Sequence, residues 1–474
     1  MPDSDTTQTN DARATRAEQV ARLATRPLPE WFSDAKLGIF VHWTAATVPA
    51  FAPVGPDPFA LAEEHGWGHA LAHTPYVEWY ENSLGIEGSP VQQHHLQVYG
   101  SDYPYARFVD TFRRTAQGAD VEAWAELFAA AGAGYAVLVT KHHDGVTLWP
   151  SATPNPHRPN WTLERDIVGD FASAVRDRGL RFGAYYSGGL DWTFIGPSTG
   201  HPIDSMEAMM SAIPQSDDYA AYADAHWREL VERYAPEVLW NDIGYPKAAN
   251  MHDLFEWYYA LIPMGIVNDR FDFIGTMKGR AHADFRTPEY SGRDAIDETP
   301  WETTRGIGTS FGYNAWAADN DLIGHYDLAR FFIDTVSKGG NLLLNVGPNA
   351  DGEIPWNQAS RLLALGHWMK TNGAAITGSR PWKHFGATAR HGGDPIDVRF
   401  TRHGEDLYAL VLGRPDATVI TIDGLSEATD PERVEWLGRS GGIEWVRDGD
   451  TITVTFPVRP ADTAAVGLRL VGSA

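Results

Sequence analysis

Polar side chains follow a series of short apolar runs between residues 38 and 270. The runs and their polar endings are GIFVHW with His42 and Trp43, YAVLVTKHHDG with Lys141, His142, His143 and Asp144, RFGAYYSGGLDW with Tyr185, Tyr186, Asp191 and Trp192, EVLWND with Trp240, Asn241 and Asp242, and GIVNDR with Asn268, Asp269 and Arg270. A single such residue is as often a helix cap or a ring that seals the rim of a sheet as a functional group. A series of endings that all present His, Trp, Tyr or an acid indicates one shared site.

Two acids in this region have the character of a catalytic pair. Asp242 ends the run EVLWND and is followed by Ile243 and Gly244, so we expect it to be fixed and partly desolvated. Glu289 lies in the irregular segment ADFRTPEY. Glycoside hydrolysis needs one carboxylate as nucleophile or base and a second carboxyl group as the acid on the leaving oxygen. Taken alone, Glu289 could equally be a solvated loop residue.

The adjacent His142 and His143 raise the question of a metal site. Neighbouring side chains of an extended segment point in opposite directions, so the two rings are poor joint ligands, and neither HxH nor HExxH spacing occurs. The chain has no cysteine, which excludes a thiolate zinc site and a cysteine nucleophile. We expect neutral imidazoles that bond sugar hydroxyl groups, and neither a metal nor a cofactor.

Composition narrows the class of partner. The 474 residues carry 62 acidic against 38 basic side chains, a formal charge of -24 that repels nucleic acid and anionic membranes. The 18 tryptophans suit either a large aromatic core or stacking on sugar rings. The chain opens with a polar stretch and has no long apolar run, which predicts no secretory signal, no membrane span and a cytoplasmic location.

The order of the elements predicts how these residues meet. Short β-branched runs alternate with amphipathic helices, which predicts a parallel sheet, and a closed (β/α)8-like TIM barrel over residues 27–378 fits best. In such a barrel the carboxyl ends of the strands share one face. A doubly wound open sheet is the alternative, weakened by the lack of a glycine-rich phosphate loop. Residues 1–26 suggest a disordered lead-in, and the alternating runs of residues 379–474 suggest an antiparallel β-sandwich.

Long stretches of the chain resemble glycoside hydrolase family 29, the α-L-fucosidases, and most closely their thermophilic bacterial type. The stretches are WFSDAKLGIFVHW, EWYENSL, YAVLVTKHHDGVTLWPS, RDIVGDFASAVRDRGLRFGAYYSGGLDW, EVLWNDIGYP, VNDRFDF, DFRTPEY, PWETTRGIGTSFGYN and SKGGNLLLNVGP. They lie in one order over roughly residues 27–380. The resemblance implies a barrel followed by a β-sandwich, and exo-acting hydrolysis of α-L-fucosides with retention of configuration and without a cofactor.

The resemblance also implies a role for individual residues. Asp242 matches the family's nucleophile, and Glu289 matches the acid/base, with Glu302 of PWETT as the alternative. The expected sugar-binding residues are His42, Glu78, Trp79, His142, His143, Tyr185, Trp240 and Arg270. Phe271 and Val146 depart from the common Trp and Phe and are expected to alter a pocket wall or the aglycone side. Residues 55–73 look inserted and are expected to reshape the entrance.

Two other functions remain open at this point. A barrel glycosidase could act on a related sugar such as a galactoside, and a homologue on the same fold could bind sugar without catalysis. The expected partners are a fucosylated glycan or glycoside and further copies of the chain in a homo-oligomer, since exposed faces of this fold often self-associate.

Overall fold

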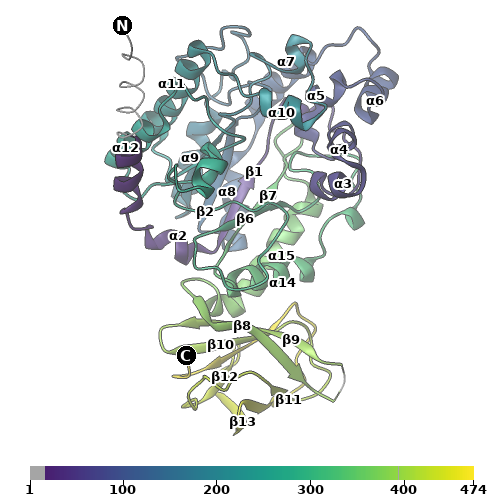
Figure 1. Cartoon of the computed structure of the whole chain (residues 1–474). Coiled ribbons are helices and arrows are strands. Elements are labelled where there is room, and N and C mark those ends of the chain that lie inside the picture. Colours follow the sequence, from purple (N-terminus) through teal and green to yellow (C-terminus); the bar gives the residue numbers. More distant parts are fainter. Residues whose placement is uncertain (1–15, 393) are drawn as a thin grey trace.

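The computed structural model describes residues 16–392 and 394–474 and divides into a helix-rich part and a smaller part made of strands (Figure 1). The helix-rich part is built on a parallel sheet with the strand order β5-β4-β3-β2-β1-β7-β6. Its strands are β1 (Leu37–Val41), β2 (Tyr135–Lys141), β3 (Arg181–Tyr186), β4 (Val238–Asn241), β5 (Ile266–Val267), β6 (Glu302–Gly306) and β7 (Asn341–Val346). This order runs around a ring instead of outward from a central switch point, so the doubly wound alternative is wrong.

The eighth strand of the expected barrel is replaced by an irregular segment, residues 284–290. Isolated parallel bridges join this segment to the neighbourhoods of β5 and β6, namely Asn268–Phe285, Arg286–Trp301 and Glu289–Thr304. Its backbone N–H groups also reach both neighbours, because Asp284 donates to the Val267 carbonyl and Tyr290 to that of Thr304. The parallel sheet is therefore a seven-stranded partial barrel whose gap is spanned by the segment that carries Glu289.

Helices cover the outer face of the sheet between successive strands (Figure 1). The connecting helices are α8 (Val121–Ala131), α9 (Ile167–Asp177), α11 (Asp217–Tyr234), α12 (Met251–Leu261), α14 (His325–Ser337) and α15 (Trp356–Asn372). The others are α2 (Glu30–Ala35), α3 (Pro58–His65), α4 (Trp67–Ala72), α5 (Tyr80–Gly85), α6 (Pro90–Val98), α7 (Ala106–Thr115), α10 (Met206–Ser211) and α13 (Phe273–Met277). Side-chain caps begin several of them: Asp120 caps α8, Asp166 caps α9 and Ser216 caps α11. The expected insertion at 55–73 forms α3 and α4.

The expected disordered lead-in is ordered where the structure describes it. Residues 16–24 are helical, and Leu23 is buried in the main core. Arg22 forms an ion pair with Glu256 of α12 at 2.8 Å, and Arg26 forms one with Asp284 at 3.0 Å. These contacts between residues far apart in sequence give the segment an order that its polar composition did not indicate. Residues 1–15 of the expected lead-in lie outside the described residues.

The C-terminal part is a closed antiparallel barrel, so the expected β-sandwich is wrong in its closure. Its strands are β8 (Arg380–Arg390), β9 (Ile396–His403), β10 (Asp406–Val411), β11 (Val419–Ile422), β12 (Val434–Trp436), β13 (Gly442–Asp448), β14 (Thr451–Thr455) and β15 (Val466–Leu470), in the order β10-β15-β12-β13-β14-β11-β8-β9. The long strand β8 shifts its register between Pro381 and Gly386 and pairs with both β9 and β11. Such an irregularity bends a strand, which lets β8 close the ring.

The two parts share a buried interface. Tyr408, Leu410, Ala464 and Ala465 of the C-terminal part belong to the same hydrophobic cluster as α14 and α15. Trp368 Nε1 donates to the Ala465 carbonyl at 3.1 Å. Among the helices of the described residues, none is both long and apolar enough to cross a membrane.

Candidate active site

One guanidinium group joins the two candidate catalytic acids. Asp242 is the first residue after β4, and Arg270 lies in the short 3-10 helix η5 (Asp269–Phe271) after β5. Arg270 Nη1 donates to Asp242 Oδ1 at 3.0 Å, and its Nη2 donates to Glu289 Oε2 at 2.9 Å. Arg270 Nε donates to Thr287 Oγ1 at 3.0 Å, which fixes the plane of the fork. The two carboxyl groups therefore face one another within the span of a single side chain.

Asp242 is held at both its side chain and its backbone. Its Oδ2 accepts a hydrogen bond from the Tyr185 hydroxyl at 2.9 Å. Burial raises the pKa of Asp242, while the positive charge of Arg270 opposes that rise. The next residue, Ile243, has φ of 55°, a left-handed conformation that is strained for a β-branched side chain. The Asp242 carbonyl accepts from the Gly189 N–H at 3.0 Å, so neighbouring backbone holds this strained turn in place.

Glu289 is held in a similar way. Its Oε1 accepts a hydrogen bond from the Tyr76 hydroxyl at 2.6 Å. The following residue, Tyr290, has φ of 49° and is fixed by its N–H, which donates to the Thr304 carbonyl at 3.0 Å. Both candidate acids thus precede a left-handed residue other than glycine, an uncommon conformation that tends to occur at functional sites.

Glu302, the alternative acid, lies below the pair with both of its oxygens already engaged. It is 0% exposed in β6, where Oε2 accepts from the Tyr135 hydroxyl and Oε1 accepts from Trp240 Nε1 at 3.1 Å. Burial raises the pKa of Glu302 to about 7. The guanidinium of Arg270 lies over the Trp240 ring at 4.7 Å. Trp240 and then Arg270 link Glu302 to the two acids, which suits a residue that positions its neighbours.

His42 presents a proton acceptor to the site. Asn345 Nδ2 donates to the Phe311 carbonyl at 2.6 Å, which leaves Asn345 Oδ1 as the acceptor for His42 Nδ1–H at 2.6 Å. Burial lowers the pKa of His42 to about 3, so the ring is neutral. A neutral ring protonated on Nδ1 has a free lone pair on Nε2.

A hydrogen bond at Nδ1 also orients the His143 ring. Ser187 Oγ donates to the Leu190 carbonyl at 2.6 Å and accepts from His143 Nδ1 at 2.6 Å, which again leaves Nε2 as an acceptor. His142 stacks on Tyr185 with ring centroids 5.5 Å apart, and its Nδ1 has no hydrogen-bond partner among the described residues. Burial lowers the pKa of both histidines well below the ordinary value.

Glu78 and Trp79 reach the site from the 3-10 helix η2 (Val77–Trp79). Glu78 Oε2 accepts from the Gly312 N–H at 2.9 Å. Burial raises the pKa of Glu78 to about 7, and the nearby charges of Glu289 and Asp242 add to the rise. The Trp79 ring meets His143 edge-on at 5.5 Å.

The structure brings the sequence-predicted site residues into one connected group. Among the residues that the structure describes, no cluster of three or more His, Cys, Asp and Glu is arranged to hold a metal ion. The site can supply two carboxyl groups, neutral imidazole acceptors and a fixed guanidinium donor. Phe271 and Val146, expected to alter a pocket wall or the aglycone side, are each 2% exposed and belong to the main hydrophobic core. Their effect on the pocket stays a prediction.

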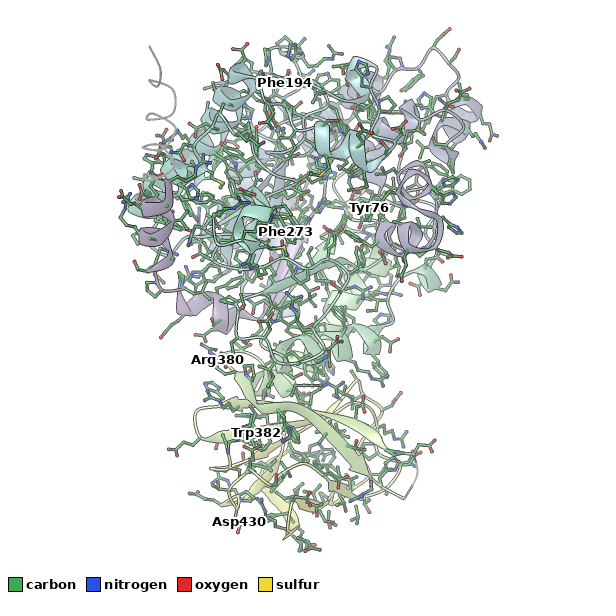
Figure 2. The ribbon with its side chains drawn as sticks, in the orientation of Figure 1. Tyr76, Phe194, Phe273, Arg380, Trp382 and Asp430 are labelled. Carbon is green, nitrogen blue, oxygen red and sulfur yellow. The ribbon has the colours of Figure 1, made fainter. Side chains whose placement is uncertain are left out.

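Sequence reasoning missed four residues that hold the site together: Tyr76, Ser187, Thr287 and Asn345. Two of them carried a signal. Tyr76 is two residues before Glu78, and Asn345 is a polar residue late in the apolar run NLLLNVGP. Figure 2 labels Tyr76 within the helix-rich part of the chain.

Comparison with known proteins agrees with this geometry. Residues 5–374 match the profile of the α-L-fucosidase family. The chain is 30% identical to the tissue α-L-fucosidase of Rattus norvegicus over 94% of this chain and 89% of that protein. It is 31% identical to the tissue α-L-fucosidase of Homo sapiens, over 92% of this chain and 87% of that protein.

Solved structures of α-L-fucosidases are also similar to this chain. The α-fucosidase of Thermotoga maritima, crystallised in complex with fucose, is 38% identical with a TM-score of 0.82, over 95% of this chain and 98% of that one. A further solved α-L-fucosidase is 37% identical with a TM-score of 0.86, over 95% of this chain and 99% of that one. The profile match, the whole-length relatives and the shared fold show that this chain belongs to the α-L-fucosidase family of glycoside hydrolases.

Proposed function

We propose that the protein removes terminal α-L-fucosyl groups from glycosides by double displacement with retention of configuration. In this proposal Asp242 is the nucleophile and Glu289 is the acid/base. The observation that carries it is the fork of Arg270, which bonds Asp242 at 3.0 Å and Glu289 at 2.9 Å. Retaining glycosidases keep their two carboxyl groups close, about 5–5.5 Å apart, so that no water fits between the nucleophile and the sugar.

The reaction runs in two balanced steps. An oxygen of Asp242 attacks the anomeric carbon while the Glu289 carboxylic acid gives its proton to the departing glycosidic oxygen. The product is a β-configured fucosyl-enzyme and a free alcohol. Water then attacks the same carbon as the Glu289 carboxylate takes its proton, which releases Asp242 and α-L-fucose. Both oxygens of Glu289 are bonded in the sugar-free site, so the acid has to leave one partner to reach the leaving group.

Neutral imidazoles and carboxylates bind the sugar. The Nε2 lone pairs of His42 and His143 accept hydrogen bonds from sugar hydroxyl groups, and Glu78 accepts a further one. Arg270 donates, and Trp79 with Trp240 supplies apolar surface for the C6 methyl group and the C–H face. The substrate is a fucosylated glycan or glycoside. A galactoside carries a hydroxymethyl group instead of the methyl group, and this apolar wall leaves that hydroxyl without a partner.

The experiment that tests this proposal is hydrolysis of a panel of α-L-fucosides and galactosides, with the first anomer of the released sugar followed by NMR. We expect α-L-fucose first and faster turnover of fucosides than of galactosides. If β-L-fucose appears first, the enzyme inverts and the double displacement is wrong. Faster turnover of galactosides favours the related-sugar alternative, and binding without turnover favours the inactive homologue.

Three broader expectations stay predictions. The proposed domains are a catalytic barrel over residues 27–378 and a supporting C-terminal domain over residues 379–474. A homo-oligomer is tested by sedimentation at several protein concentrations. A cytoplasmic location is tested by fractionation of the source cells.

A further inference from the structure

A cavity lies where the two parts of the chain meet, at the opposite end of the barrel from the catalytic acids. Its volume is about 440 Å³, and its walls include Lys36, Trp301, Arg380, Trp382 and Arg402. Lys36 directly precedes β1, whereas the catalytic acids follow the carboxyl ends of the strands. Figure 2 labels Arg380 at the junction of the two parts and Trp382 within the C-terminal part.

Lys36 is the unusual member of this cavity. The residue is 2% exposed, yet its side chain makes no hydrogen bond or ion pair with any residue that the structure describes. A buried ammonium group without an acceptor is costly, because it loses its hydration and gains no partner. Burial first, and then the charge of Arg380, lower the pKa of Lys36 to about 7, while Asp34 opposes the change.

Two further cations face the same space. Arg380 and Arg402 are directly opposite partners in the β8–β9 ladder, an arrangement in which like charges repel. Arg380 pairs with Asp34 at 2.8 Å, but Arg402 has no ion pair among the described residues.

Two acids, Asp297 and Glu298, line the cavity beside these cations. Asp297 is engaged by the Thr299 N–H at 2.9 Å and by Arg293 at 3.2 Å, and Glu298 is exposed. The protein as a whole carries a formal charge of -24, which repels anions from most of its surface. Lys36 is buried without an acceptor among the described residues, whereas the Arg380 side chain is 37% exposed and Arg402 is exposed. Three cations around one cavity are therefore a local exception on this acidic protein.

We propose that this junction cavity binds a phosphate-type oxyanion, free or carried by a small organic molecule, through Lys36, Arg380 and Arg402. The anion supplies the acceptor that Lys36 lacks and separates the two opposed arginines. Lys36 belongs to the barrel and both arginines to the C-terminal part, so the bound anion joins the two. The cavity has room for more than the oxyanion, and Trp382 and Leu28 offer an apolar wall to an organic group.

Isothermal titration of the full chain with sulfate tests the proposal, because the charge of sulfate does not change near neutral pH. We expect one saturable site in the wild type. Lys36→Met keeps the apolar stem and removes the charge, and we expect it to weaken sulfate binding by about tenfold or more. Arg402→Met weakens it as well. Lys370→Met, which removes an exposed charge on α15, is the matched control and leaves the affinity unchanged.

The pH dependence of binding gives a second readout. Binding requires the charged form of Lys36, so sulfate affinity falls as the pH rises from about 6 to about 8, with proton uptake on binding. Asp34, Asp297 and Glu298 also face the cavity, and any contribution from them persists in Lys36→Met. The difference in pH dependence between wild type and variant is therefore the part due to Lys36.

The outcomes separate the alternatives. Lys36→Arg keeps the charge and retains binding, which guards against a loss of affinity caused by misfolding of Lys36→Met. Titrations with inorganic phosphate and with glycerol phosphate distinguish a free anion from an organic phosphate. Equal sulfate affinity of wild type and Lys36→Met overturns the proposal. Hydrolysis of an aryl α-fucoside stays unchanged in Lys36→Met, so failure here is distinct from failure of the proposed catalytic mechanism.

Discussion

Glu302→Gln tests whether the carboxyl group below the site positions Trp240 or acts as the catalytic acid. The two oxygens of Glu302 accept from Tyr135 and Trp240, and the side chain is 0% exposed. Glutamine has one acceptor oxygen, so its NH2 group opposes the second donor. A buried donor that loses its acceptor costs about 1–3 kcal/mol, so we expect the variant to be less stable by that amount at about pH 5.

The sign of the pH effect follows from the raised pKa. Burial moves the pKa of Glu302 from 4.5 to about 7, so between these values the folded chain keeps a proton that the unfolded chain releases. The contribution of this proton to stability is complete below 4.5 and is lost as the pH rises through about 7. The whole shift in the pKa of Glu302 corresponds to about 3 kcal/mol in the free energy of unfolding. Glutamine does not titrate, so the stability advantage of the wild type over the variant shrinks by about that amount between pH 5 and pH 8.

The assay is urea unfolding at about pH 5 and about pH 8, followed by tryptophan fluorescence. Glu126→Gln, which changes an exposed acid on α8, is the control and should show no such pH-dependent difference. A difference between wild type and Glu302→Gln that stays constant with pH refutes the reasoning. Activity gives an independent check. If Glu302→Gln slows poor leaving groups far more than activated aryl fucosides, then Glu302 is the acid.

Four further predictions rest on single contacts. Tyr76→Phe removes the 2.6 Å hydrogen bond to Glu289, which is worth about 1.5–3 kcal/mol. We expect kcat to fall by about tenfold or more for substrates with poor leaving groups and by less for aryl fucosides. An equal loss of kcat for both substrates contradicts this prediction. Burial raises the pKa of Glu78 to about 7, so inhibition by free fucose should strengthen as the pH rises through that value, and Glu78→Gln should abolish the trend. Asn345→Leu releases the His42 ring and should raise KM more than it lowers kcat, whereas unchanged steady-state kinetics would show that Asn345 does not orient it. Truncation after Gly378 uncovers the shared core and should give insoluble or inactive protein, and a soluble, fully active barrel would contradict the supporting role.

The sequence predicted the positions of site residues that directly follow an apolar strand. Asp242 and His42 each follow an apolar run, and parallel strands place such endings on one face. The convergence of these residues was therefore predictable from the chain alone. The packing adds that Tyr135 and Trp240 donate to the two oxygens of Glu302, which no sequence pattern indicates. The choice of Glu289 over Glu302 stays a prediction.

The remaining differences arise from tertiary contacts that leave no local signal. The alternating runs after residue 379 predict strands, but closure into a barrel depends on the register shift within β8. Residues 16–24 are ordered by contacts such as Arg22 with Glu256, which lies far away in sequence. Phe271 and Val146 pack in the main hydrophobic core, which the stretches around them do not indicate.

The stereochemistry of azide products tests the central assignment most directly. Each of the variants Asp242→Gly and Glu289→Ala is incubated with an activated aryl α-L-fucoside and azide, and the anomer of the fucosyl azide is read by NMR. Without the nucleophile, azide attacks from the vacated face and Asp242→Gly gives the β, inverted product. Without the acid/base the nucleophile still acts, so azide intercepts the fucosyl-enzyme and Glu289→Ala gives the α, retained product. Wild-type rates in Asp242→Gly, or the α product from Glu302→Ala and not from Glu289→Ala, would contradict the assignment of the two acids.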